Sequence, residues 1–252
     1  MKIPDAVLRE LLDQRELSPV AKIVWQTTTK CQPRSMNELS TKANVSRSAA
    51  LVACRQLAGR KWMSFAKTGY RIRPVALIPH EYQVKMAEDF EAIYRLVRNR
   101  GEFLMRRYLD LRVWSDEYVD NARPEFLVNP TTDEPLEYDR YYMSKVAFEF
   151  NGPQHYGTTE MYPDDKAFRE AKARDLIKKA LSTNAGVKLI TVRAEDLLPD
   201  AFERLIPVEL PLNDVDKDGP YFKALVRACS AYVARAAALG GAVQAAKAAA
   251  KK

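Results

Sequence analysis

Hydrophobic residues recur every three to four positions in three short stretches near the N-terminus, which is the spacing of one face of an α-helix. Each stretch follows a serine whose hydroxyl can accept a hydrogen bond from the first helical turn. At the second stretch, Ser35 and Glu38 match the capping box, in which each side chain satisfies a free backbone N–H group. The predicted helices span about residues 18–27, 35–43 and 46–59.

The hydrophobic period changes after Gly59. Two short runs, at about 62–66 and 70–73, flank a turn that contains Gly69 and predict a β-hairpin. A short helix, a turn and a longer helix form the helix-turn-helix pattern. Together with the hairpin, this pattern resembles a winged-helix domain over about residues 15–75.

In winged-helix domains the third helix enters the major groove of DNA, and the hairpin contacts phosphates. The resemblance therefore implies DNA contacts from the polar face of that helix and from the hairpin. The candidates are Arg47, Ser48, Arg55 and Gln56 of the helix, and Lys67, Arg71 and Arg73 of the hairpin.

The charge distribution agrees with a polyanionic partner. The chain has 40 basic and 33 acidic residues among 252, but 14 of the basic and only 5 of the acidic side chains lie in residues 1–80. Such a local excess favours double-stranded DNA, because binding releases the counterions of the phosphates. The alternative is a winged helix that docks a protein, with its charges forming a solvated face.

Two further β-rich runs, at about 135–142 and 145–151, are separated by a short polar turn and predict an antiparallel hairpin. Asp139 and Glu149 can converge on neighbouring strands of this hairpin. Two adjacent carboxylates repel each other unless a divalent cation lies between them. Glu149 also interrupts an apolar strand, where an unpaired charge is costly.

The same segment resembles the restriction-endonuclease-like (PD-(D/E)XK) nuclease superfamily, in the branch related to very-short-patch repair endonucleases. That branch has a helix Glu, a strand Asp and then Glu-x-x-Gly-x-Gln-His-Tyr, which match Glu102, Asp139 and residues 149–156. A helix with Lys178 and an apolar strand at 186–193 continue the match, which covers about residues 100–196.

The resemblance implies that Asp139 and Glu149 bind Mg²⁺, with Mn²⁺ as a substitute. The backbone carbonyl of Phe150 is a candidate third ligand. Glu102 would reach the metal through water or orient the nucleophile. A carboxylate in the first turn of a helix also complements the helix dipole, which is a purely structural role for Glu102.

The sequence departs from the superfamily pattern at the usual lysine, whose position is taken by Asn151. Gln154 is one candidate for this role, and Lys178 can restore the positive charge from the following helix. His155 is a candidate acid or base. The departure leaves open whether the core is catalytic or a degenerate nuclease core kept for DNA binding.

The C-terminal part contains an acidic stretch, 214–219, which imitates the start of a calcium loop. Leu225 stands where the bidentate Glu of such a loop is expected, so we interpret the stretch as a linker. An apolar helix at 221–239 and an Ala/Lys-rich tail follow. The predicted domains are 1–78 (winged helix), 79–99 (connecting helix), 100–205 (nuclease core) and 206–252 (linker, packing helix and tail). The predicted fold class is α/β (α+β).

The remaining features exclude several other classes. The three cysteines are odd in number and form no Cys-x-x-Cys pair, which argues against a disulfide framework and a zinc site. The chain has no Walker motif, glycine-rich dinucleotide loop or Gly-x-Ser-x-Gly elbow. Without a signal-like or membrane-spanning apolar run, we expect a cytoplasmic protein with no membrane partner.

These features predict a Mg²⁺-dependent DNA endonuclease in which a winged helix positions duplex DNA. One alternative is a DNA-binding regulator or recombination accessory with an inactive core. Another is the nuclease subunit of a transposition or repair complex, in which the winged helix docks a partner. A homodimer or a larger nucleoprotein complex is compatible with each, and the recognition sequence stays open.

Overall fold

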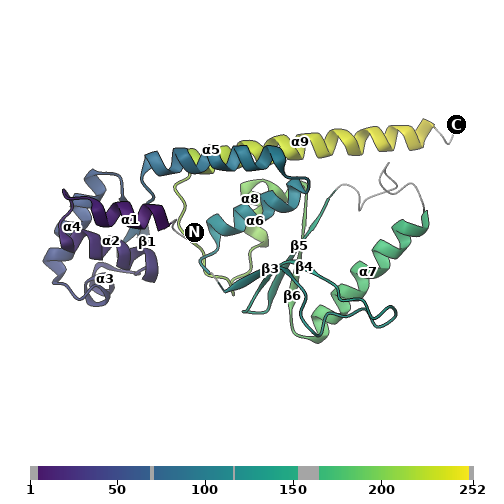
Figure 1. The fold of residues 1–252 in the computed structure, drawn as a ribbon, viewed down its shortest axis with the longest axis horizontal. Helices are drawn as coiled ribbons and strands as arrows, with labels where there is room; N and C mark the ends of the chain where they lie inside the picture. Colours follow the sequence, from purple (N-terminus) through teal and green to yellow (C-terminus); the bar gives the residue numbers. More distant parts are fainter. Residues whose placement is uncertain (1–4, 69–70, 116, 153–164, 250–252) are drawn as a thin grey trace. The chain divides into compact units, whose positions relative to one another are not determined.

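The computed structural model describes residues 5–68, 71–115, 117–152 and 165–249. Its helices and sheets confirm the predicted α+β class (Figure 1). The chain divides into two compact units. The N-terminal unit contains the chain up to Phe90 and the segment Asp214–Lys223, and the core unit contains Glu91–Asn213 and the chain from Ala224 onward. Within the described ranges, every helix is too short or too polar to cross a bilayer.

The N-terminal unit has the three predicted helices followed by the predicted antiparallel hairpin. Its elements are α1 (Asp5–Asp13), α2 (Pro19–Cys31), α3 (Met36–Lys42), α4 (Arg47–Gly59), β1 (Met63–Thr68) and β2 (Arg71–Ala76). The three serines act as expected, since the hydroxyls of Ser18, Ser35 and Ser46 accept backbone N–H groups at 3.1, 3.2 and 3.1 Å. Helix α2 is longer than predicted, and α1 was not predicted.

Trp25 holds the helices of this unit to the hairpin. Its side chain is fully buried, and its indole Nε1 donates to the carbonyls of Trp62 at 3.0 Å and Leu77 at 3.2 Å. Trp62 directly precedes β1 and Leu77 directly follows β2, so one indole holds the start of the first strand and the end of the second. The indole rings of Trp25 and Trp62 also pack at 5.8 Å between centroids.

The acidic linker belongs to the N-terminal unit. Asp214 forms an ion pair with Arg73 of β2, and Asp216 accepts a hydrogen bond from Gln83 Nε2 at 3.1 Å. Gln83 lies in α5 (His80–Leu96) and is buried. A Cβ at Gly219 would lie 1.9 Å from Gln83 Oε1, so only glycine allows this close approach. The carboxylates that imitate a calcium loop are therefore engaged by protein groups.

The core unit is built on a four-stranded sheet in the order β3-β4-β5-β6. Its strands are β3 (Tyr118–Ala122), β4 (Tyr138–Tyr142), β5 (Val146–Asn151) and β6 (Lys188–Arg193). Strands β3, β4 and β5 are antiparallel neighbours, which confirms the predicted hairpin, and β6 runs parallel to β5. The other elements are α6 (Arg100–Arg112), α7 (Asp165–Asn184), η2 (Glu195–Leu197) and α8 (Pro199–Leu205). Helix α9 (Pro220–Ala249) belongs to the core unit from Ala224 onward.

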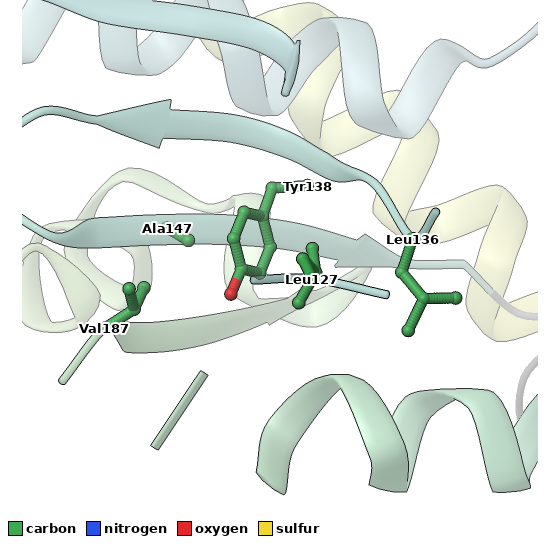
Figure 2. Close-up of a cluster of buried hydrophobic side chains, with 5 residues drawn as sticks. All are labelled: Leu127, Leu136, Tyr138, Ala147 and Val187. Atoms are coloured by element: carbon green, nitrogen blue, oxygen red, sulfur yellow. The ribbon is translucent and has the colours of Figure 1, made fainter. Parts of the chain in front are cut away.

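A buried cluster fixes α7 to the sheet (Figure 2). Its members are Leu127, Leu136, Tyr138, Ala147 and Val187, with Ile177 and Leu181 of α7 packed against them. The hydroxyls of Tyr138 and Ser182 lie 2.5 Å apart and join β4 to the same helix. Because α7 is held at Ile177 and Leu181, the neighbouring Lys178 has a fixed position relative to β5.

Candidate active site

Asp139 and Glu149 lie on the adjacent antiparallel strands β4 and β5, as predicted. The strands are in register with Arg140 opposite Phe148. The backbone N–H of Phe150 donates to Asp139 Oδ2 at 2.6 Å, which ties this carboxylate to the end of β5. Lys178 of α7 donates its ammonium to Glu149 Oε1 at 2.5 Å. Two carboxylates and one cation from three elements therefore meet at one end of the hairpin.

The surroundings of Asp139 disfavour its ionised form. Burial raises the pKa of Asp139 to about 7, and the charges of Glu149 and Glu102 act in the same direction. The Phe150 N–H group and Lys178 oppose this shift without cancelling it. The carboxyl group is thus held in a place where an additional positive charge would be favourable.

Glu149 has a similar imbalance. Burial raises the pKa of Glu149, and the charge of Asp175 adds to the effect, while Lys178 and the Asp139 backbone lower it. One of its oxygens, Oε2, is buried and has no hydrogen-bond partner within the described part of the chain. A buried carboxylate oxygen that accepts no hydrogen bond lowers the stability of a fold, so this position calls for a donor or a cation.

Glu102 reaches this region from the first turn of α6 because Gly101 lets the helix approach β5 closely. A Cβ at Gly101 would lie 2.1 Å from the Phe150 ring and 2.7 Å from the Tyr232 hydroxyl. Asn99 Nδ2 donates to the Glu102 carboxylate at 3.3 Å. Glu102 is therefore placed by contacts as well as by its favourable position at the helix N-terminus.

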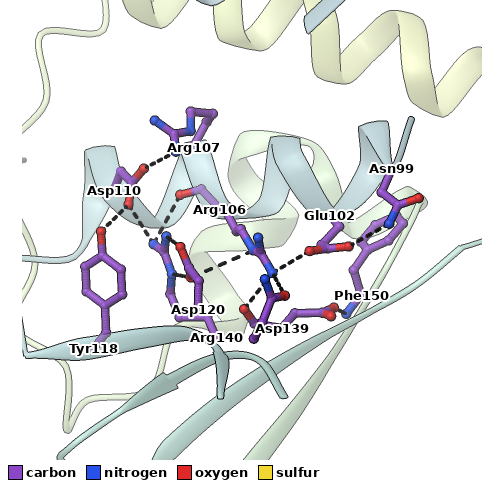
Figure 3. A network of polar contacts seen from close by, with 11 residues as sticks. Asn99, Glu102, Arg106, Arg107, Asp110, Tyr118, Asp120, Asp139, Arg140 and Phe150 are labelled. Atoms are coloured by element: carbon purple, nitrogen blue, oxygen red, sulfur yellow. Dashed lines mark hydrogen bonds and ion pairs between the residues drawn. The ribbon is translucent and has the colours of Figure 1, made fainter. Parts of the chain in front are cut away.

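Sequence reasoning missed Arg106, which joins three elements beside the site (Figure 3). Its guanidinium pairs with Glu102 one turn earlier on α6, and donates to Asn121 Oδ1 at 2.6 Å and to the Asp139 carbonyl at 2.9 Å. The i, i+4 spacing of a Glu and an Arg was a visible signal for the first of these contacts. The other two depend on strand positions that the sequence does not reveal.

Sequence reasoning also missed Arg140, which is fully buried next to Asp139. Its guanidinium donates to Asp120 and to Asp110, each at 2.7 Å, and lies 4.0 Å from the centre of the Tyr118 ring. Burial acts to lower the pKa of Arg140, but the hydrogen bond to Asp120 and the charge of Asp110 outweigh burial and hold the pKa above its ordinary value. Figure 3 shows this network along α6.

The described residues include no group of three or more His, Cys, Asp or Glu side chains arranged to hold a metal ion. Mg²⁺ usually needs only one or two protein carboxylates, because water and substrate phosphates fill its other positions. Asp139 and Glu149 meet that smaller requirement with their raised pKa values and the unpartnered Oε2. Two carboxylates therefore fit Mg²⁺ or Mn²⁺, and the donors among the described residues do not include the sulfur and imidazole ligands typical of zinc.

The structure places the other predicted site residues as follows. Asn151 ends β5, opposite Arg193 of β6, so no lysine occupies that strand position. Lys178 lies at Glu149, as described above. Gln154 and His155 lie outside the described residues.

The predicted DNA contacts fall into three groups. Arg47, Ser48 and Arg55 of α4 and Lys67 of β1 are exposed. Gln56 instead donates to the Glu16 carbonyl and accepts from Ser18, each at 3.1 Å, and Arg73 pairs with Asp214. These two side chains are engaged within the protein. The side chain of Arg71 lies outside the described residues.

Comparisons with known proteins give one similarity and no assignment of activity. No protein-family model matches the chain, and no solved structure matches it. A curated protein of Invertebrate iridescent virus 3, "Uncharacterized protein 033L", is 33% identical over 113 residues. The match covers 42% of this chain and 57% of the viral protein, so the chain spans little more than half the length of that relative.

Proposed function

We propose that this protein is a divalent-metal-dependent DNA endonuclease. The observation that carries the proposal is the pairing of Asp139 with Glu149 on adjacent strands, with Glu149 Oε2 buried and unpartnered in the described part of the chain. Burial of two interacting carboxylates destabilises the fold, and perturbed titratable pairs of this kind cluster at functional sites. A cation between the carboxylates removes the repulsion.

The residues around the pair support hydrolysis of a phosphodiester. A divalent cation held by Asp139 and Glu149 would polarise the scissile phosphate and make an attacking water more acidic. Lys178 brings a positive charge to the same place from α7, where it can face a phosphate oxygen. Glu102, which Arg106 and Asn99 hold in place, would orient the attacking water. Lys178 would thus take the role of the lysine that Asn151 replaces.

Several features of the N-terminal unit support duplex DNA as the substrate. Three helices and a hairpin follow one another in the order of a winged helix. Arg47 and Arg55 are exposed on α4, and Lys67 is exposed on the hairpin. Residues 1–80 carry 14 basic against 5 acidic side chains, an excess suited to phosphate binding.

Cleavage of supercoiled plasmid tests the proposal. The full chain is compared with Asp139→Asn and Glu149→Gln, with Mg²⁺, with Mn²⁺ and with a chelator, at matched DNA occupancy. Glu117→Gln is the control, because Glu117 is an exposed carboxylate of the same unit. We expect metal-dependent nicking or linearisation by the wild-type and the control, and none by the two site variants. Equal DNA binding without cleavage by all four proteins would favour the regulator with an inactive core.

A second experiment tests the substituted lysine. Lys178→Gln should lower the cleavage rate by about 10²-fold, because one charge facing the phosphate is lost. Adding Asn151→Lys to that variant returns a lysine to the strand position used by the superfamily. We expect part of the rate to return in the double variant. If Lys178→Gln has no effect on the rate, Lys178 only neutralises Glu149.

A further inference from the structure

Helix α4 exposes two large aliphatic side chains between its charged residues. Leu51 is 37% exposed and Val52 is 65% exposed, although the same helix buries Ala50, Ala53, Cys54 and Leu57. Burying Leu51 or Val52 as well would have stabilised the unit. Their exposure on the helix that carries most of the predicted DNA contacts therefore needs an explanation.

The exposed side chains of α4 form one face in three levels. Arg47 and Ser48 occupy the first turn, Leu51 and Val52 the second, and Arg55 the third, all exposed. Residues four apart lie above one another on a helix. Along the helix, the face is therefore basic and polar in the first turn, apolar in the second turn and basic in the third. From Arg47 to Arg55 the helix rises by about 12 Å, or three to four base-pair steps.

We propose that Leu51 and Val52 recognise the 5-methyl group of thymine in the major groove, between base pairs contacted by the basic levels of α4. This inference rests on the DNA-binding part of the proposed function. The thymine methyl is the apolar group that natural DNA presents in the major groove, where aliphatic side chains contact it. Arginine favours guanine on either side, because guanine presents two acceptors there.

Charge favours DNA over a protein as the occupant of this face. Helix α4 carries two arginines and no acidic side chain, a charge balance that suits the phosphates of duplex DNA. Here the apolar level is one turn wide and has an exposed arginine on either side, at positions 47 and 55. The excess of basic over acidic residues in 1–80 extends this preference to the whole unit.

The test begins with selection of preferred duplexes from a random pool by the full chain, with a chelator present to prevent cleavage. Each thymine of the selected site is then replaced by deoxyuridine, which removes only the methyl group. We expect about fourfold weaker binding for each contacted methyl group. Leu51→Ala and Val52→Ala should reduce this discrimination. Leu12→Ala, a change at a 57% exposed leucine of the same unit, should retain it.

The outcomes separate this inference from the proposed function. Equal binding of thymine and deoxyuridine duplexes by the full chain would overturn the inference and leave DNA binding intact. Retained discrimination in the double variant Leu51→Ala/Val52→Ala would overturn the assignment to these side chains. If the chain enriches and binds no duplex, DNA binding by this unit fails as well, and the aliphatic level is a protein contact.

Discussion

Two consecutive residues of β4, Asp139 and Arg140, have opposite electrostatic surroundings. Arg140 is fully buried, yet two aspartates and an aromatic ring accommodate its charge. Asp139 accepts the Phe150 N–H group but faces the charges of Glu149 and Glu102, which help to raise its pKa. The fold therefore surrounds one charge with opposite charges and places its neighbour beside like charges.

This difference separates the charges of the core that stabilise the fold from the pair at which we propose that a cation binds. A buried ion pair with complete partners rigidifies a protein and requires nothing further. A cluster of carboxylates with an unpartnered oxygen persists only if the rest of the fold compensates, and such strain gathers at functional sites. The Arg140 network is thus a structural support, and the Asp139–Glu149 pair next to it is the candidate site.

Removing the charge of Arg140 should have the largest effect on stability. Arg140→Met removes the common partner of Asp110 and Asp120, which are half-buried and keep their weaker contacts with Arg107, Tyr118 and Arg106, so we expect a loss of about 3 kcal/mol in the free energy of unfolding. Urea denaturation measures it. The triple variant Arg140→Met/Asp110→Asn/Asp120→Asn also removes the two carboxylate charges that lose Arg140 and should recover part of the loss. A single-variant loss below about 1 kcal/mol would contradict the supporting role.

A smaller effect is expected where α6 meets β5. Gly101→Ala should destabilise the protein by about 1–3 kcal/mol, because the new Cβ would meet the Phe150 ring at 2.1 Å. Glycine to alanine in a helix otherwise stabilises by about 0.5–1 kcal/mol, so the sign itself is diagnostic. Gly59→Ala is the control, because nothing lies within 4 Å of a Cβ there. A stabilised Gly101→Ala variant in thermal denaturation would show that the close approach is not required.

The local parts of the fold could be predicted from the sequence. The three serine caps, the helices after them and both hairpins depend on contacts between residues close in sequence. Strand β3 was missed because it is short and polar, and its Asn121 has a positive φ of 52°. Helix α1 was also missed, although Leu11 in it is buried.

The candidate site divides in the same way. The pairing of Asp139 with Glu149 could be predicted, since one hairpin brings them together. The partners of Arg106 and Arg140 could not, because their contacts cross from α6 to β3 and β4. For Gln56 and Arg73, the polar or charged residue type was visible, but not the contacts to Glu16, Ser18 and Asp214 that engage these side chains.

Asparagine at position 139 should raise the stability of the metal-free protein instead of lowering it, because it removes one of two carboxylates that repel each other. Asp139→Asn keeps an acceptor for the Phe150 N–H group and removes the repulsion with Glu149. The raised pKa, about 7, means that ionisation of Asp139 destabilises the fold progressively as the pH rises from about 4 through about 7. In metal-free buffer the variant should therefore be more stable than the wild-type at about pH 8, and equal to it near pH 4.

Mg²⁺ should reverse this ranking. Binding to the wild-type carboxylates raises the melting temperature at about pH 8, and the variant should gain less. Asp133→Asn, a change at an exposed turn residue, should behave as the wild-type at every pH and Mg²⁺ concentration. Differential scanning fluorimetry measures the melting temperatures of all three proteins at each pH and Mg²⁺ concentration. Equal stabilisation of the wild-type and Asp139→Asn by Mg²⁺ would mean that the cation binds elsewhere. The repulsion between Asp139 and Glu149 would then only destabilise the protein, with no ligand to relieve it.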